Sequence, residues 1–279
     1  MPIGISLHIG LNSVDPIHYQ GWSGPLTACE ADAQSMQEIA LSRGFKSQLL
    51  LTSNATRQNV TNEIISSASQ LNSEDIFLLS YSGHGGQLPD WNLDETDQQD
   101  ETWCLYDGQL VDDEIYALLG RFRAGVRILV FSDSCHSGTT IKMAYYYGSS
   151  RSPALTFDRP NSISYRAMPN DVALKVYQAN KATYDSILQD TALKDTKSRV
   201  VASALLISGC QDNQLSADGT FNGLFTGTML RVWSNGAFTG NYRDFHAGIV
   251  RRMPPDQTPN YFTVGEPNAV FEGQSPFSI

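Results

Sequence analysis

The sequence has few cysteines, and none of them are paired in a metal-binding or redox spacing. Its four cysteines, Cys29, Cys104, Cys135 and Cys210, lie far apart in a chain of 279 residues. Neither a zinc-ligand spacing nor a Cys-x-x-Cys pair is present. We therefore interpret Cys104 and Cys210 as small apolar residues in the core of a protein from a reducing compartment. Cys135 lies in a different sequence context.

Long hydrophobic runs are also absent. No stretch approaches the roughly 20 apolar residues that cross a bilayer. The first residues, MPIGISLHIGLN, have no basic segment before their short apolar run, unlike a signal peptide. We expect a cytoplasmic protein that does not bind membranes. With 41% hydrophobic and 17% charged residues, the composition is that of an ordinary globular protein.

Positive charge is scarce in the first half of the chain. The net charge is −10, which argues against a general nucleic-acid binder. There is no lysine or arginine from Gln58 to Gly120, while Asp90 to Glu114 contains ten acidic residues. By contrast, nine of the 19 basic residues lie between Lys142 and Arg199. An acidic region is thus followed by a basic one.

Hydrophobic periodicity predicts strands that alternate with helices. We expect strands over 3–9, 45–51, 75–81, 126–132, 203–208 and 260–271, and helices over 28–43, 56–71, 111–122, 222–233 and 242–253. This alternation is typical of a mostly parallel sheet with helices on both faces, in a single domain. In such folds the functional residues gather at the carboxyl ends of the strands.

Two of the predicted strands run into sequences rich in reactive and small residues. The strand 75–81 leads into Ser82-Gly83-His84-Gly85-Gly86, and 126–132 leads into Asp133-Ser134-Cys135-His136-Ser137-Gly138. A thiol becomes a good nucleophile when a neighbouring imidazole promotes loss of its proton, and the imidazole can then protonate a leaving amine. We therefore predict a catalytic pair of His84 and Cys135, and interpret His136 as a bystander.

Main-chain amides beside this pair could stabilise a developing oxyanion. Glycines let a substrate backbone approach closely and leave N–H groups free to point at it. The amides of Gly85 and Cys135 are the predicted donors.

Together, the motifs Tyr-Ser-Gly-His-Gly and Asp-Ser-Cys-His-Ser-Gly closely resemble those of the metacaspases and the bacterial orthocaspases. Ala28-Cys29-Glu30-Ala31-Asp32 is similar to the first-helix motif of that family, and 206–211 with 223–226 is similar to the start of its small-subunit portion. The resemblance implies a caspase-like three-layer sandwich around a six-stranded, mostly parallel sheet. It divides the single domain 1–279 into a large-subunit-like part (1–139), a basic linker or insertion (140–199) and a small-subunit-like part (200–279).

The resemblance also implies a substrate class. Members of this family cleave after arginine or lysine through a thioester acyl-enzyme, so we expect protein or peptide substrates with basic residues, and a monomeric enzyme. Carried over by position, the specificity pocket uses Asp32 and Asp133, with Cys29 and Ser82 lining it. Two carboxylates can hold a guanidinium through paired, charge-assisted hydrogen bonds.

Calcium binding is the point where the sequence departs from the family pattern. Asp100, Asp112 and Asp113 stand at positions similar to three of the family's calcium ligands, but the fourth position holds Lys142. Calcium takes six to eight oxygen ligands, and an ammonium group repels it. We therefore expect no required cofactor and only a weak dependence on calcium.

The basic linker allows several roles. Linkers of this family are places of self-cleavage, and here Arg151, Arg159, Arg166 and Lys175 are candidate cleavage positions. The linker could serve as a substrate of its own active site or as a plug that occludes it. In the alternative interpretation, residues 171–188 form a packed helix whose basic side chains only face solvent.

Three other functions were weighed against a peptidase. A caspase-like scaffold would normally have lost a catalytic residue, and this chain keeps both. A thiol phosphatase needs an arginine six positions after the cysteine, where Ile141 stands. A calcium-binding regulatory protein would need the EF-hand spacing, which the acidic region lacks. The scaffold remains the alternative to the enzyme.

Overall fold

The computed structural model describes residues 1–89, 99–134, 165–209, 218–219, 221–255 and 257–279. The elements of the main sheet and its helices are β1 (Gly4–Gly10), α1 (Cys29–Ser42), β2 (Lys46–Leu51), α2 (Arg57–Gln70), β3 (Ile76–Ser82), α3 (Asp112–Leu119), β7 (Arg127–Asp133), β8 (Ser203–Ser208), α7 (Leu224–Trp233), α8 (Tyr242–Val250) and β9 (Asn260–Gly265). The smaller elements are η1 (Thr52–Asn54), β4 (Gly85–Pro89), β5 (Gln99–Leu105), β6 (Gly108–Val111), α5 (Asn170–Ala179), α6 (Lys181–Leu188), η2 (Thr196–Arg199), η3 (Ser234–Gly236) and α9 (Ala269–Glu272).

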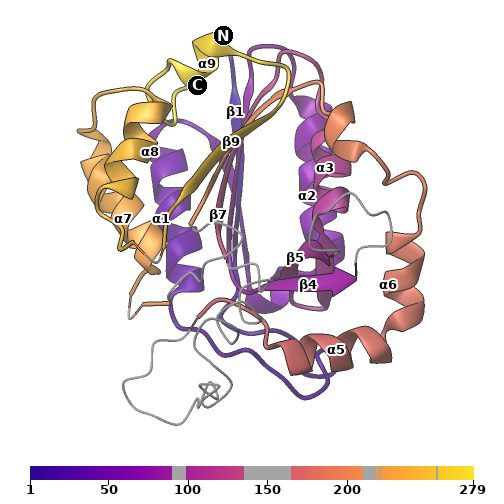
Figure 1. Ribbon diagram of the computed structural model, residues 1–279. Coiled ribbons are helices and arrows are strands. Elements are labelled where there is room, and N and C mark those ends of the chain that lie inside the picture. The colour runs from indigo at the N-terminus through magenta and orange to yellow at the C-terminus, as the bar shows by residue number, and fades with distance from the viewer. Residues whose placement is uncertain (90–98, 135–164, 210–217, 220, 256) are drawn as a thin grey trace.

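Six strands form one twisted sheet in the order β2-β1-β3-β7-β8-β9. All neighbouring pairs are parallel except β8 and β9, which are antiparallel. Helices α1, α7 and α8 cover one face of the sheet, and α2 and α3 cover the other (Figure 1). The predicted three-layer α/β architecture is confirmed.

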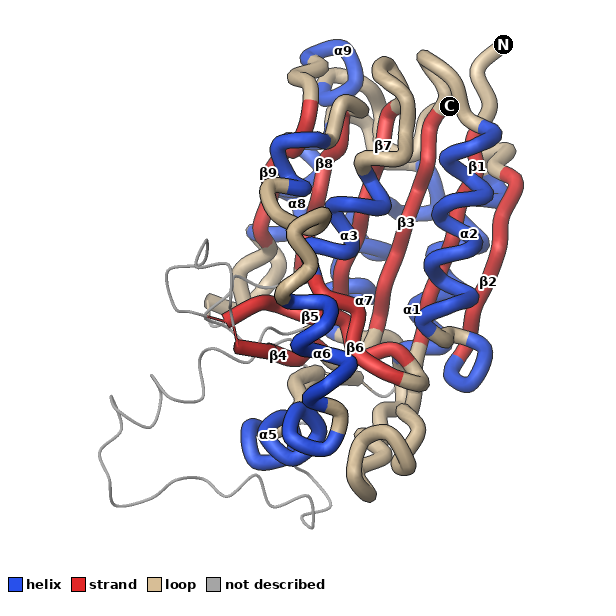
Figure 2. The backbone as a smooth tube through the Cα atoms, turned by 90° about the vertical axis from the view of Figure 1, so that its right-hand side faces the viewer, coloured by secondary structure: helices blue, strands red, loops and turns tan. Residues whose placement is uncertain are grey.

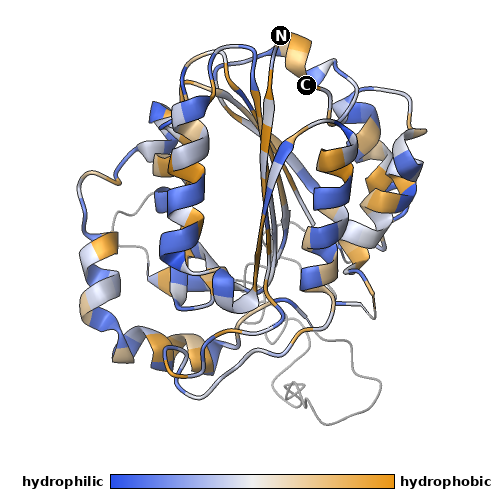
Figure 3. Ribbon diagram, turned by 180° about the vertical axis from the view of Figure 1, so that it is seen from behind, coloured by the Kyte–Doolittle hydropathy of each residue, from blue (hydrophilic) through white to orange (hydrophobic). Residues whose placement is uncertain are grey.

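Burial on both faces explains why the central strands are almost continuously apolar. Every residue of β1 and of β3 is buried, and hydrophobic residues recur along the strands of the main sheet (Figure 3). Two clusters of buried residues result, one on each side of the sheet. Cys104 belongs to neither and is fully buried near Val111, as expected of a core cysteine, whereas Cys210 lies outside the described residues.

A small antiparallel sheet, β4-β5-β6, lies at the carboxyl edge of the main sheet (Figure 2). We had not predicted it, because β4 and β6 are short and begin with glycine, and β5 begins within an acidic run that has the composition of a solvated loop. Its first strand starts one residue after His84, and the backbone N–H of Cys104 on β5 donates to the His84 carbonyl at 2.9 Å. This sheet therefore fixes the segment that carries the predicted catalytic histidine.

The predicted last strand is too long. Strand β9 ends at Gly265, and residues 269–272 form the short helix α9. Gly265 has a φ of +81°, and Pro267 follows two residues later, so the chain turns out of the sheet there. Among the described residues, no helix is long and apolar enough to span a membrane.

Residues 170–188 are helical, as one interpretation of the linker expects. They form α5 and α6, which lie beyond β4 and β5 at the carboxyl edge (Figure 1). Val176 and Tyr184 are buried, whereas the side chains of Lys175 and Lys181 are 64% and 53% exposed. These two lysines pair with acidic residues on their own helices.

Candidate active site

His84 follows β3 by two residues and is almost completely buried. Its Nε2 lies 3.0 Å from the carbonyl oxygen of Gly24, and its ring packs against Trp22 at a centroid distance of 4.7 Å. The other ring nitrogen, Nδ1, is buried and makes no hydrogen bond of ordinary length and angle to the described residues, although the Ala167 backbone lies close enough to raise the pKa of the ring. If Nε2 carries the proton and donates it to Gly24, Nδ1 is left as the free, basic nitrogen.

The surroundings of His84 keep its imidazole neutral. Burial, opposed by the Gly24 carbonyl, lowers the pKa of His84 to about 4, and the positive charge of Arg166 acts in the same direction. At neutral pH the ring can therefore accept a proton, as a general base must.

Cys135 lies outside the described residues, but the strand that leads to it does not. Strands β3 and β7 pair in parallel, with Ser82 opposite Asp133, and the Gly83 amide donates to the Asp133 carbonyl at 3.4 Å. His84 and Cys135 each follow this last pair by two residues. The two motifs thus leave neighbouring strands at the same edge, as predicted.

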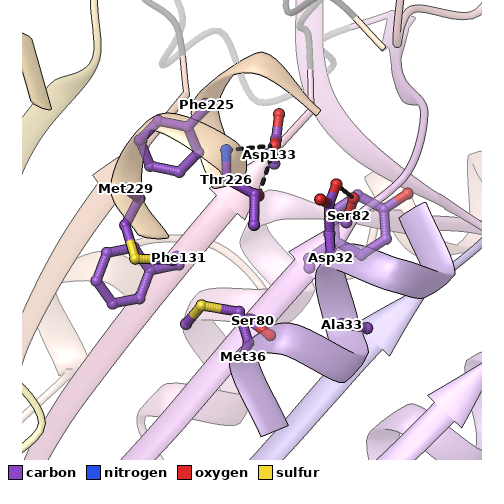
Figure 4. A pocket seen from close by; sticks show the side chains of 11 residues that line it. Asp32, Ala33, Met36, Ser80, Ser82, Phe131, Asp133, Phe225, Thr226 and Met229 are labelled. Carbon is purple, nitrogen blue, oxygen red and sulfur yellow. Dashed lines mark hydrogen bonds between the residues drawn. The ribbon is translucent and has the colours of Figure 1, made fainter. Parts of the chain in front are cut away.

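Asp32 and Asp133 come together beside these strand ends, although they are about 100 residues apart in sequence. Asp32 lies on α1, and Asp133 is the last residue of β7 (Figure 4). Both carboxylates are buried, with exposures of 1% and 2%. Asp32 is thus no ordinary exposed helix residue, and Asp133 does not simply end a strand.

Helix α7 and the turn before it orient both carboxylates. Asp32 Oδ1 accepts from Asn222 Nδ2 at 2.9 Å and from the Gly223 amide at 3.0 Å. Asp133 Oδ2 accepts from the amide and the hydroxyl of Thr226 at 3.1 and 2.7 Å (Figure 4). The C-terminal part of the chain therefore fixes the acidic groups that the N-terminal part contributes.

The guanidinium of Arg166 fills the space between these carboxylates. Arg166 comes from the basic linker, and its side chain is completely buried. Nη2 lies 2.7 Å from Asp32 Oδ2, and Nη1 lies 2.9 Å from Asp133 Oδ2. Nη1 also donates to the Ser82 hydroxyl at 2.8 Å, and that hydroxyl donates to Asp32 at 2.8 Å.

The backbone around Arg166 runs alongside Gly85. The Gly85 amide donates to the Arg166 carbonyl oxygen at 2.9 Å, and the Met168 amide donates to the Gly85 carbonyl at 2.8 Å. Gly85 is one of the two predicted oxyanion donors. In a bound substrate, the residue before the scissile bond would place its side chain in the pocket and its carbonyl oxygen against the oxyanion donor. Arg166 makes both of these contacts.

A third carboxylate, which we had not predicted from the sequence, completes the pocket. Asp218 Oδ1 lies 3.0 Å from Arg166 Nη2. Gly223 also contributes, because a Cβ added there would lie 2.5 Å from Arg166 Nη2. No motif marks Asp218 or Arg166, and only the folded chain brings them to the strand ends.

Burial and charge act against each other in this cluster. Burial alone would lower the pKa of Arg166, but Asp133, Asp32 and Asp218 raise it above its usual value. Burial raises the pKa of Asp32 to about 6 although the guanidinium opposes this. Burial would likewise raise the pKa of Asp218, yet Arg166 and hydrogen bonds from Thr27 hold it below its usual value.

The remaining predicted pocket residues are Ser82 and Cys29. Ser82 lines the pocket and bridges Arg166 and Asp32. Cys29 is fully buried, and burial raises the pKa of its thiol to about 12 in spite of the nearby Arg166 charge. It can contribute shape to the pocket wall but no thiolate at neutral pH.

The three predicted calcium ligands lie around β5 and α3. Asp100 is buried on β5, and Asp112 and Asp113 open α3, where Asp113 accepts from Thr196 at 3.1 Å. Within the described ranges, no group of three acidic, histidine or cysteine side chains could hold a metal ion. Lys142 lies outside the described residues, so the calcium prediction stays untested.

Comparison with known proteins agrees with this geometry. Residues 14–268 match the family model of the caspase domain. Metacaspase-1 of Mycosarcoma maydis is 32% identical over 234 residues, which cover 76% of this chain and 58% of that protein. Metacaspase-1 of Schizosaccharomyces pombe is 29% identical, with 76% and 56% coverage. The chain thus spans somewhat more than half the length of these relatives.

Two solved structures have a similar fold. A Geobacter sulfurreducens protein is 59% identical, with a TM-score of 0.89 over 100% of this chain and 99% of that one. Caspase-1 of Spodoptera frugiperda is only 12% identical but reaches a TM-score of 0.56 over 95% of this chain and 86% of that one, which shows the shared fold. The paired motifs, the six-stranded sheet and these matches lead to one conclusion: the chain belongs to the caspase-domain family of peptidases and is similar to the metacaspases.

Proposed function

We propose that this chain is a cysteine endopeptidase that cleaves after arginine or lysine, with Cys135 as nucleophile and His84 as base. The observation that carries the substrate class is the seating of Arg166. A pocket that buries a guanidinium completely, against Asp32, Asp133 and Asp218, has the shape and charge for a basic side chain. An aspartate side chain would meet three like charges there.

The proposed reaction begins when His84 Nδ1 takes the proton of the Cys135 thiol. The thiolate sulfur attacks the carbonyl carbon that follows the basic residue, and the carbonyl oxygen becomes an oxyanion near the Gly85 amide. The C–N bond breaks, His84 protonates the leaving amine, and a thioester remains. Water then attacks the thioester with His84 as base, which releases the acid and restores the thiol.

Neutral His84 and its unpaired buried Nδ1 support this role. An unpaired ring nitrogen alone does not distinguish a catalytic role from a structural one, because buried His8 on β1 has one as well; His84 differs in its position after β3, beside the strand that leads to Cys135. A catalytically silent scaffold remains the rival function, and such a scaffold would not need His84 Nδ1 as a base. The two functions differ in whether a thiol-directed peptide electrophile ending in arginine labels Cys135.

Replacing either member of the pair should abolish hydrolysis. We expect Cys135→Ala and His84→Ala to reduce kcat for an arginine peptide at least a hundredfold, since general-base assistance alone is typically worth 10²–10⁴. Fluorogenic peptide assays measure the rates, and circular dichroism verifies the fold. Ser66→Ala, at an exposed position on α2, serves as the control and should keep its activity. A His84→Ala enzyme with more than about a hundredth of the wild-type rate would remove His84 from the mechanism.

Substrate binding should weaken in acid. Burial raises the pKa of Asp32 to about 6, so below that pH this carboxylate gains a proton and loses the charge that faces the guanidinium. We expect KM for arginine peptides to rise as the pH falls through about 6. Peptides with norleucine in place of arginine provide the comparison. If KM for both peptides changes equally with pH, Asp32 is not the group responsible.

Arg166 should compete with external substrates and present its own peptide bond. We expect stored wild-type protein to yield fragments that end at Arg166 and begin at Ala167, detected by mass spectrometry, and Cys135→Ala to stay whole. Arg166→Gln should lack these fragments and hydrolyse arginine peptides without an initial lag, because its pocket is open from the start.

Lys175→Gln is the matched control, since Lys175 is exposed on α5. It should behave as wild type. Arg166→Lys keeps the buried charge if Arg166→Gln folds poorly, and should cut more slowly at this position. Wild-type fragments in the Arg166→Gln digest, together with an unchanged lag, would contradict an occluding role for Arg166.

Activity should depend only weakly on calcium, because Lys142 stands where a fourth acidic ligand would be expected. We expect chelator-treated enzyme to regain less than about tenfold in rate when calcium is added, since a calcium site needs six to eight oxygen ligands. Lys142→Asp supplies the missing carboxylate and should increase the response. An increase of several orders of magnitude with the wild type would contradict this expectation.

A further inference from the structure

The third carboxylate of the pocket has a different origin from the first two. Asp32 and Asp133 belong to α1 and β7, whereas Asp218 stands in the connection between β8 and α7. Neither the motifs nor the family resemblance points to it. Its side chain is only 4% exposed, and one oxygen is directed at the seated guanidinium.

Asp218 is held in place through its second oxygen. Oδ2 accepts from the Thr27 amide at 2.8 Å and lies 3.0 Å from the Thr27 hydroxyl. That hydroxyl also donates to the Gly219 carbonyl at 2.8 Å. Thr27 lies two residues before α1, so this contact joins the 218–219 segment to the helix that carries Asp32. The contacts with Thr27 thus orient the Asp218 carboxylate so that its other oxygen can accept a hydrogen bond from a guanidinium.

The two terminal nitrogens of the guanidinium bind different partners. Nη1 contacts Asp133 and Ser82, and Nη2 contacts Asp32 and Asp218. A lysine ammonium is a single point charge and cannot occupy both positions. Placed among three buried carboxylates, it would leave at least one without a charged partner, which is costly in a buried site.

We propose that Asp218 is a specificity-determining residue that makes this pocket prefer arginine over lysine. The inference rests on the proposed peptidase function and narrows its substrate class. Asp218 is the second carboxylate at Nη2, and a lysine that pairs with Asp133 has no second nitrogen to place there. The preference is therefore greatest when Asp218 is charged and fixed by Thr27.

The test compares two matched fluorogenic peptides that differ only in arginine or lysine before the cleaved bond. It uses the full-length Arg166→Gln chain, so that the internal arginine does not compete, and the wild-type chain in parallel. We expect kcat/KM to favour arginine by about tenfold or more, the usual effect of a hydrogen bond to a charged group. Asp218→Asn should lower the arginine value by a similar factor and raise the lysine value, because it removes the carboxylate that a lysine leaves unpaired, so the ratio falls toward one.

Three further variants separate specificity from general damage. Asp218→Glu should retain part of the arginine preference, and Thr27→Val, which removes only the hydroxyl anchor, should reduce it less than Asp218→Asn does. Asp171→Asn, an exposed acidic residue on α5, is the control and should leave both values unchanged. If Asp218→Asn lowers both peptides equally and the ratio persists, Asp218 has only a structural role and the inference fails.

A binding measurement keeps this result distinct from the peptidase proposal. Calorimetry with acetyl-arginine amide and acetyl-lysine amide on the Cys135→Ala, Arg166→Gln chain requires no catalysis. Tighter binding of the arginine amide that Asp218→Asn removes would support the inference even if no peptide is cut, in which case the peptidase proposal alone would fail. Equal Kd values for the two amides would overturn the inference even in an active enzyme.

Discussion

The contact between the Arg166 guanidinium and three buried carboxylates determines how the parts of this site are arranged. Asp32, Asp133 and Asp218 come from a helix, a strand end and a connecting segment, and Arg166 comes from the linker. Burying one charge costs several kcal/mol unless it is paired, and three carboxylates at close range repel one another. A basic side chain satisfies both demands at once. The three carboxylates are therefore most stable when a basic side chain occupies the pocket, and in this structure Arg166 of the same chain occupies it.

The main sheet makes this arrangement possible. Parallel strands direct their carboxyl ends to one edge, so Ser82 and Asp133 become register partners and the residues that follow them emerge together. The small sheet that begins at Gly85 fixes the segment that carries His84, through the hydrogen bond from the Cys104 amide to the His84 carbonyl. The same Gly85 amide then meets the Arg166 carbonyl. The proposed catalysis and side-chain recognition thus depend on backbone positions that the strand pairing fixes.

The sequence predicted the strands and helices of the main sheet well, because their hydrophobic patterns reflect burial on one or both faces. The paired motifs predicted His84, and the family resemblance placed Asp32 and Asp133 in one pocket; the structure brings these two carboxylates together, and the roles of all three residues stay predictions. The β4-β5-β6 sheet was missed because β4 and β6 are only 5 and 4 residues long and β5 begins within an acidic run. Arg166 was one of four predicted cleavage positions in the linker but was not singled out as the occupant of the pocket, and Asp218 was not predicted at all, because both roles arise from contacts across 134 and 52 residues of sequence. One basic residue in a basic linker carries no local sign of such a contact.

The measurement that tests this account most directly is digestion of a proteome-derived peptide library by the Arg166→Gln enzyme beside the same chain with Cys135→Ala. Mass spectrometry of the new peptide ends tests two things at once, whether cleavage needs Cys135 and which side chain the pocket accepts. The account predicts ends after arginine, with fewer after lysine, and none above background in the Cys135→Ala sample. Ends after aspartate or large apolar residues, or equal cleavage by both samples, would contradict it.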